Sequence, residues 1–78
     1  MTTVQVFCYG PLKKFTGTGT NQTSIELEQP IPVRDIVKML GVPAQDIQSV
    51  LINGGIATLD NIVGHEDRIA LIPLLGGG

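Results

Sequence analysis

The chain carries one stretch with the period of a helix, and this stretch lies between segments with the period of a strand. Apolar side chains recur there at i, i+3, i+4 and i+7, at Val33, Ile36, Val37 and Leu40. Pro32 suits the first position of the helix, and Gly41 suits the left-handed position after its last turn. No Ser, Thr, Asp or Asn directly precedes Pro32, so we expect a poorly capped amino end. A single short helix among strands favours folds in which the helix covers one side of a sheet.

Two strands are predicted before this helix. Residues 4–9 alternate between two sets of side chains, Val4, Val6 and Cys8 on one side and Gln5, Phe7 and Tyr9 on the other. Residues 24–28 resume a clean alternation. The polar, glycine-rich stretch 16–21 between them predicts a hairpin with a long loop.

Three further strands are predicted after the helix. Residues 50–52 form a short apolar strand, and Asn53-Gly54 is a strong signal for a tight turn into residues 56–58. A turn at residues 64–67 leads into the last strand, residues 68–74. The complete order predicts an α+β fold, a mixed sheet with one main helix packed on one face.

The size of the chain limits how this fold is stabilised. Its 78 residues have room for one domain, and 42% of them are hydrophobic, a composition that forms a core. The single cysteine, Cys8, cannot form an intramolecular disulfide, so the fold depends on packing. We expect one domain over residues 1–78, with residues 74–78 as a flexible carboxyl-terminal tail.

Charge and hydropathy argue against two classes of partner. A net charge of -2 and a pI near 5.0 disfavour nucleic acid, because counterion release needs clustered Lys and Arg. The longest apolar run, residues 69–75, contains Pro73 and is too short to cross a bilayer. The first residues lack the basic and apolar segments of a secretory signal. We therefore expect a cytoplasmic protein that binds neither nucleic acid nor membranes.

The sequence contains no pattern of catalytic side chains. Cys8 lies in a strand and is expected to be a small buried hydrophobe, whereas His65 lies in a turn and is expected to be solvated. These two residues do not supply the converging ligands of a metal site. Gly17-Thr18-Gly19 lacks the lysine and the helix of a phosphate-binding loop and is expected to be a turn. We predict that the chain alone is not an enzyme and binds no metal or cofactor.

The helix can cover only one face of the sheet, yet both faces carry apolar side chains. Phe7 and Tyr9 point away from Val4, Val6 and Cys8, and Ala70, Ile72 and Leu74 point away from Ile69 and Leu71. We favour a docking patch for another protein on the second face. The alternative is that the loop at residues 12–15 folds over it.

The sequence ends in Gly76-Gly77-Gly78, directly behind an apolar run. Glycines have no side chains to pack in a core, but an extended run of them can pass through a channel too narrow for any other residue. Such a segment could deliver its terminal carboxylate into the active site of a partner. The alternative is an ordinary frayed end.

Several segments together resemble a known family. They are Leu51-Ile52-Asn53-Gly54, the run from Asp67 to Pro73, and the glycine terminus. With the order of elements, they look like the MoaD/ThiS-type sulfur carriers, which are ubiquitin-like proteins of the β-grasp fold. Residues 4–7 and 12–17 are also similar to the molybdopterin synthase small subunit.

The resemblance implies a function for the terminal carboxylate, which here belongs to Gly78. A ubiquitin-activating-type enzyme would use ATP to adenylate it, and a sulfur donor would convert it to a thiocarboxylate. Gly76 and Gly77 would be the thin stem that enters the large subunit of molybdopterin synthase, or another sulfur-accepting synthase. Phe7, Ile72, Leu74 and Leu75 are the candidate docking residues.

The resemblance leaves other functions open. The carrier could instead serve thiazole or another sulfur-containing product, or the chain could be a protein modifier that forms isopeptide bonds through Gly78. A function of another class is a noncatalytic β-grasp interaction module with an inert tail.

Overall fold

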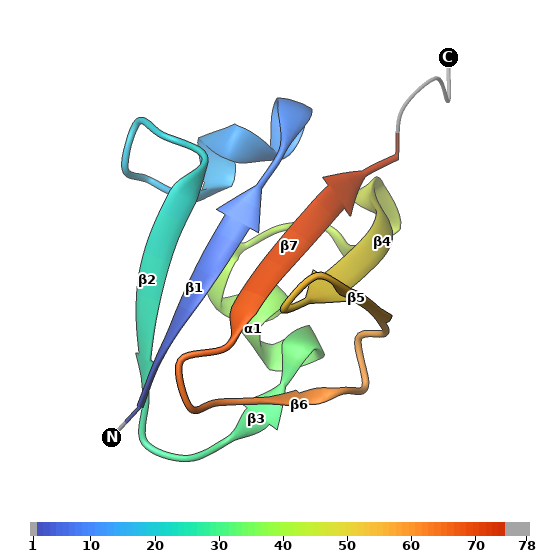
Figure 1. Ribbon diagram of the computed structural model, residues 1–78. Coiled ribbons are helices and arrows are strands. Elements are labelled where there is room, and N and C mark those ends of the chain that lie inside the picture. Colours follow the sequence, from blue (N-terminus) through green and yellow to red (C-terminus); the bar gives the residue numbers. More distant parts are fainter. Residues whose placement is uncertain (1, 75–78) are drawn as a thin grey trace.

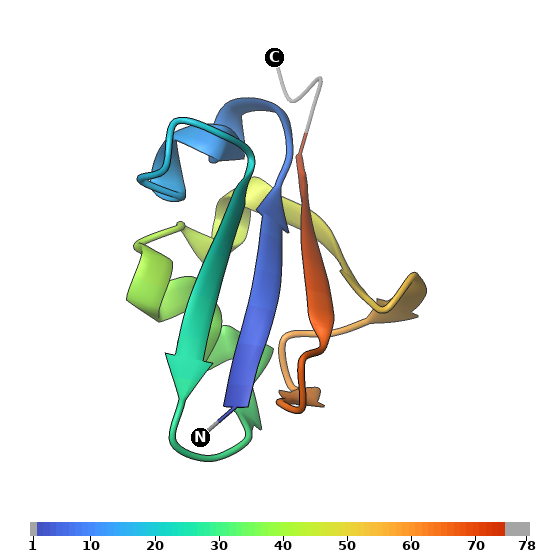
Figure 2. The same ribbon diagram turned by 60° about the vertical axis from the view of Figure 1, so that its left-hand side comes forward.

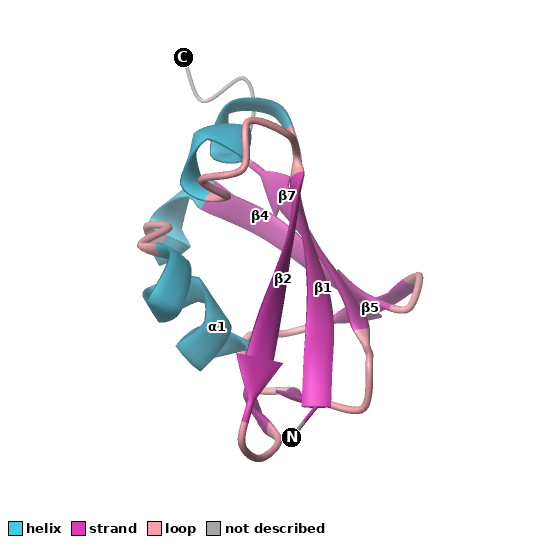
Figure 3. Cartoon of the chain, turned by 90° about the vertical axis from the view of Figure 1, so that its left-hand side faces the viewer, coloured by secondary structure: helices cyan, strands magenta, loops and turns pink. Residues whose placement is uncertain are grey.

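The computed structural model describes residues 2–74. The fold is built on a five-stranded mixed sheet with the strand order β2-β1-β7-β4-β5 (Figure 1). Its strands are β1 (Thr2–Cys8), β2 (Gln22–Leu27), β4 (Ile47–Ile52), β5 (Gly55–Ala57) and β7 (Arg68–Pro73). The helix α1 (Val33–Leu40) lies on one face of this sheet (Figure 3). The predicted α+β fold, with one main helix on one face of a mixed sheet, is confirmed.

The first and last strands of the sequence are neighbours at the centre of the sheet. β1 is antiparallel to β2 and parallel to β7, with Gln5 opposite Arg68 and Cys8 opposite Leu71. Figure 2 shows β1 and β7 running side by side in the same direction. β4 is antiparallel to β7 on its other side and to β5 at the sheet edge. Because β7 is flanked by β1 and β4, its position depends on both halves of the chain.

The helix α1 ends as predicted but begins one residue later than predicted. Gly41 adopts a φ of 79°, and its N–H donates to the carbonyl of Lys38. Pro32 lies before the helix and provides no side-chain cap. The first two helical N–H groups, of Val33 and Arg34, instead donate to the carbonyls of Asn61 and Leu59, both at 2.9 Å. A loop distant in sequence therefore satisfies the donors that no local cap satisfies.

Four short elements were not predicted. Two-residue strands, β3 (Ile31–Pro32) and β6 (Ile62–Val63), pair with each other, and 3-10 helices span Gly10–Phe15 and Ala44–Asp46. The bounds of the five predicted strands also differ. β1, β2 and β5 begin one or two residues earlier than predicted and end one residue earlier, β4 begins three residues earlier, and β7 ends one residue earlier.

The core lies between the sheet and α1. Its buried hydrophobic side chains are Val4, Val6, Cys8, Leu12, Leu27, Val33, Ile36, Val37, Val42, Val50, Val63, Ile69 and Leu71. Leu12 of the first 3-10 helix belongs to this cluster, and that helix lies on the same side of the sheet as α1 (Figure 3). The alternative in which residues 12–15 cover the second face is therefore wrong.

Candidate functional site

The side of the sheet that faces away from α1, here called the open face, carries an apolar row across four strands. The strand registers place Phe7 opposite Ala70, Ala70 opposite Leu51, and Leu51 opposite Ile56. Phe7, Leu51 and Ala70 are half-buried, and Ile56 is 91% exposed. Residues directly opposite one another on neighbouring strands have adjacent side chains, so the row is continuous.

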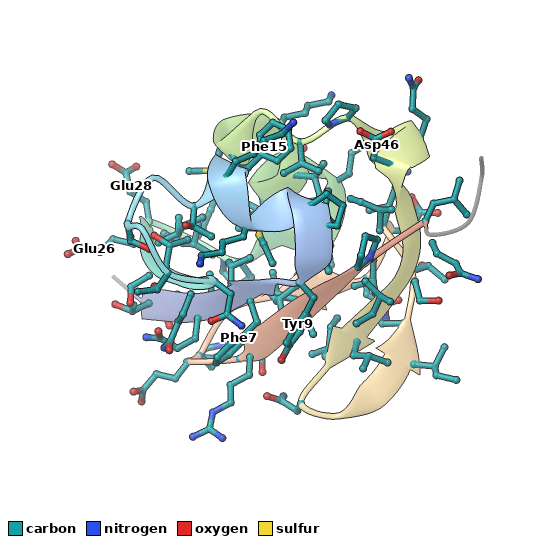
Figure 4. The ribbon with its side chains drawn as sticks, turned by 90° about the horizontal axis from the view of Figure 1, so that it is seen from above. Phe7, Tyr9, Phe15, Glu26, Glu28 and Asp46 are labelled. Atoms are coloured by element: carbon teal, nitrogen blue, oxygen red, sulfur yellow. The ribbon has the colours of Figure 1, made fainter. Side chains whose placement is uncertain are left out.

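Two further side chains extend the apolar surface toward the carboxyl end of β7. Tyr9 follows β1, and its N–H donates to the carbonyl of Leu71 at 3.3 Å, so it continues the line of the strand. Figure 4 shows Phe7 and Tyr9 on the opposite side of the sheet from the helices, while Phe15 lies on the helix side. Ile72, opposite Ser49, lies on the open face and is half-buried.

The apolar row borders a shallow hollow of about 290 Å³. Its lining residues are Phe7, Tyr9, Leu51, Gly54, Arg68 and Ala70. Two aromatic rings, two aliphatic side chains and a glycine of the β4–β5 turn thus surround a space that an apolar side chain of another molecule can enter, with a cation at its border.

The structure describes three of the seven residues predicted for the site. Phe7 and Ile72 lie on the open face. Leu74 follows β7, is 54% exposed, and donates its N–H to the carbonyl of Asp46 at 2.8 Å. The other four, Leu75, Gly76, Gly77 and Gly78, lie outside the described residues, so their roles stay predictions.

Leu51 and Ile56 were missed as members of this surface. Val50, Leu51 and Ile52 are all apolar, so alternation alone could not decide which of them faces α1. The Asn53-Gly54 turn offered one signal, because pairing across it places Leu51 opposite Ile56. The structure shows Val50 buried in the core and Leu51 on the open face.

Asn53 locks the β4–β5 turn to the start of β7. It adopts a φ of 52°, its N–H donates to the carbonyl of Arg68 at 2.8 Å, and its Oδ1 accepts the N–H of Arg68 at 2.9 Å. Its Nδ2 donates to Oδ1 of Asp67 at 2.9 Å, and Oδ2 of Asp67 accepts the N–H of Gly64 at 3.0 Å. The sequence predicted only a turn here. The side-chain bonds also fix the backbone at the edge of the open face.

The residues considered for catalysis are kept apart. Cys8 is fully buried at the end of β1, and its burial raises the pKa of the thiol. His65 is exposed in the turn before β7, with a φ of 53°. Since Cys8 pairs with Leu71, it lies toward the other end of β7 from this turn.

The described residues also give two findings on metals and membranes. Over residues 2–74, no three His, Cys, Asp or Glu side chains are grouped closely enough to hold a metal ion. In the same part of the chain, no helix has the length and apolar character needed to span a membrane.

Comparisons with solved structures place this architecture among ubiquitin-like β-grasp proteins. The small archaeal modifier protein 1 of Haloferax volcanii is similar at 19% identity, with a TM-score of 0.75, over 96% of this chain and all (100%) of that chain. The small archaeal modifier protein 1 of Methanosarcina acetivorans is similar at 22% identity, with a TM-score of 0.70, over 100% of this chain and 98% of that one. A putative molybdopterin converting factor, subunit 1, of Pyrococcus furiosus is similar at 16% identity, with a TM-score of 0.71, over 96% and 100%.

Sequence comparison identifies the family. Among curated proteins, none is significantly similar in sequence to this chain. A family described as Mut7-C ubiquitin matches residues 1–76, nearly the whole sequence. The resemblance to ubiquitin-like proteins of the MoaD type is confirmed by this match and by the shared fold. The chain belongs to the Mut7-C ubiquitin family.

Proposed function

We propose that this protein is a sulfur carrier whose Gly78 carboxylate is adenylated by a partner enzyme and converted to a thiocarboxylate. The carrier acts in the cytoplasm and donates its sulfur in molybdopterin biosynthesis. The proposal requires that Gly78 has a free carboxyl group in the mature protein.

One observation carries the proposal. The apolar surface of the open face continues through Tyr9 and Ile72 to the end of β7, where the chain leaves the sheet at the exposed Leu74. A partner docked on this face would lie beside the point where the carboxyl-terminal residues leave the sheet. Residues 75–78 would then be within reach of its active site, since each extended residue adds about 3.3 to 3.6 Å.

The chemistry of a carboxylate explains why a partner is needed. A carboxylate is a poor electrophile, so a nucleophilic sulfur cannot displace its oxygen directly. Attack of a Gly78 carboxylate oxygen on the α-phosphate of ATP would release pyrophosphate and form an acyl adenylate, in which AMP is a good leaving group. Hydrosulfide supplied by the sulfur donor would then attack the acyl carbon, the bond to AMP would break, and Gly78 would be left with a thiocarboxylate.

The acceptor in this proposal is the large subunit of molybdopterin synthase. Support comes from the fold shared with the Pyrococcus furiosus protein described as a putative molybdopterin converting factor, subunit 1. Gly76 and Gly77 would form the stem that enters the acceptor subunit. Leu75 would join Phe7, Ile72 and Leu74 at the contact.

A second candidate function is that of a protein modifier joined through Gly78 to lysines of other proteins. The observation that favours it is the fold shared with two small archaeal modifier proteins, which cover nearly all of this chain. Both functions begin with the same adenylate and differ in the nucleophile that displaces AMP.

The test is incubation of the purified protein with ATP, a sulfur donor and the adenylating enzyme of the same organism. Intact mass should show the exchange of one oxygen for sulfur at Gly78. A chain without Gly78, and one with a residue appended after it, should both fail to load while keeping the melting temperature of the parent. Absence of both adenylate and mass change in the parent would refute the proposal, whereas lysine-linked adducts would favour the modifier.

A further inference from the structure

Within residues 2–74, the open face carries a single Lys or Arg side chain out of the five in the sequence. Lys13 and Lys14 lie on the first 3-10 helix, and Arg34 and Lys38 lie on α1, so these four belong to elements on the other side of the sheet. Arg68, the first residue of β7, is exposed and borders the hollow lined by Phe7 and Leu51. The open face therefore combines an apolar surface with one positive charge.

The guanidinium of Arg68 has no anionic partner among residues 2–74. The ion pair found in this part of the chain joins Arg34 to Asp60. Asp67, next to Arg68 in sequence, already accepts hydrogen bonds from Asn53 and from the N–H of Gly64. Glu66 lines a second hollow together with Arg68 but forms no ion pair with it. The cation is thus available to a group from another molecule.

The backbone of Arg68 is nevertheless fixed. Its N–H and its carbonyl both bond to Asn53, and its strand lies between β1 and β4 in the middle of the sheet. The base of the side chain is held in place while its charged end is unpaired. A guanidinium presented in this way can bind a carboxylate through two parallel hydrogen bonds, a geometry that a lysine cannot reproduce.

We propose that Arg68 and the adjoining hollow form a two-point recognition site for a surface segment of the adenylating enzyme, an inference that rests on the proposed function. The segment carries a carboxylate that pairs with Arg68 and a neighbouring apolar side chain that enters the hollow beside Phe7 and Leu51. Charge complementarity selects a carboxylate-bearing segment, because Arg68 has no anionic partner among residues 2–74 and borders the apolar hollow. Arg68 thereby determines which partner binds and how that partner is positioned on the open face.

The test compares two charge reversals that change the net charge equally. Arg68→Glu alters the open face, and Lys38→Glu alters an exposed position of α1 on the other side of the sheet. Binding is measured by calorimetry between the purified adenylating enzyme and each variant in a chain lacking Gly78, so that docking is observed without chemistry. Arg68→Glu should raise Kd by about tenfold or more, and Lys38→Glu by about twofold at most. Equal effects of the two reversals would overturn the proposal.

Two further measurements identify the partner group. Glu66→Gln should not raise Kd, because Glu66 lies near Arg68 but forms no ion pair with it; a rise as large as that of Arg68→Glu would overturn the proposal. Exposed Asp and Glu residues of the enzyme are changed to Lys one at a time. One of these enzyme variants should bind Arg68→Glu with a Kd about tenfold lower than the unchanged enzyme does. Failure of every such change to restore binding would overturn the proposed carboxylate contact.

The same enzyme separates this proposal from the proposed function. If the full-length parent binds with the predicted dependence on Arg68 but is not adenylated, the recognition site stands and the carrier function fails. If it is adenylated equally well with Arg68→Glu, the carrier function stands and the recognition site fails. A parent that does not bind the enzyme overturns both.

Discussion

The two faces of the sheet are built from the same strands but differ in what their side chains do. On the face toward α1, β1 and β7 contribute Val4, Val6, Ile69 and Leu71, which are completely buried. On the open face, the same strands contribute the half-buried Phe7, Ala70 and Ile72, together with the exposed Arg68. One set of residues stabilises the domain, and the alternating set leaves surface for a partner. Alternate residues of a strand point to opposite faces of the sheet, so the role of a residue here depends more on which face it points to than on its hydrophobicity.

The largest expected effect comes from truncating the covered face. Ile69→Ala removes a fully buried side chain from the middle of the core and should lower the free energy of unfolding by about 2–5 kcal/mol. Ile72→Ala, three residues later on the same strand, should cost about 1 kcal/mol, because Ile72 is only half-buried. Chemical denaturation of the two variants measures both values. Equal losses would show that the open face is as important for stability as the core.

A smaller effect on stability, with a larger effect on binding, is expected from Ile72→Asp. The carboxylate can remain hydrated at the surface, so the free energy of unfolding should fall by about 1 kcal/mol. Kd for the adenylating enzyme should rise by about tenfold or more, because a charge would be buried in an apolar contact. Met39→Asp, at a residue of α1 that is 59% exposed, provides the control and should leave Kd unchanged. Similar changes in Kd for both variants would place the interface elsewhere.

The smallest effect concerns pH and tests the covered face at Cys8. Burial raises the pKa of this thiol in the folded protein, so folding favours its neutral form. The stabilisation is complete below the ordinary thiol pKa, about 8.5, and is lost as the pH rises through that value toward the raised one. Stability should therefore decline above about pH 8.5 more steeply than in Cys8→Ala. Parallel declines in the two proteins would show that the thiol is accessible to solvent.

Local patterns predicted the helix and the parity of the strands. The four-residue apolar stripe placed α1 within one residue at its start, and Gly41 ended it where a left-handed residue was expected. The alternation in residues 4–9 assigned Val4, Val6 and Cys8 to the core and Phe7 to the other face. These features depend on neighbours in sequence, which a pattern can record.

The remaining features depend on contacts between distant residues. The carbonyls of Leu59 and Asn61 cap α1, and nothing near Pro32 signals them. β3 and β6 each have two residues, too few for any period, and β4 has a register irregularity between Ile47 and Ser49 that disturbs its alternation. The network around Asn53 joins two turns that are separated by β5, a loop and β6. The terminal glycines, which suggested the function, lie outside the described residues and are still untested.

The parallel pairing of β1 with β7 also determines how the domain responds to force. β1 begins and β7 ends at opposite ends of the sheet, with Gln5 to Cys8 paired with Arg68 to Leu71 (Figure 1). A force that pulls the end of β7 away from the start of β1 acts along the strands. The hydrogen bonds between β1 and β7 are then loaded in shear, so they bear the force together and do not break one after another. The pairing of β7 with β1 therefore protects β7 from unravelling residue by residue under such a load.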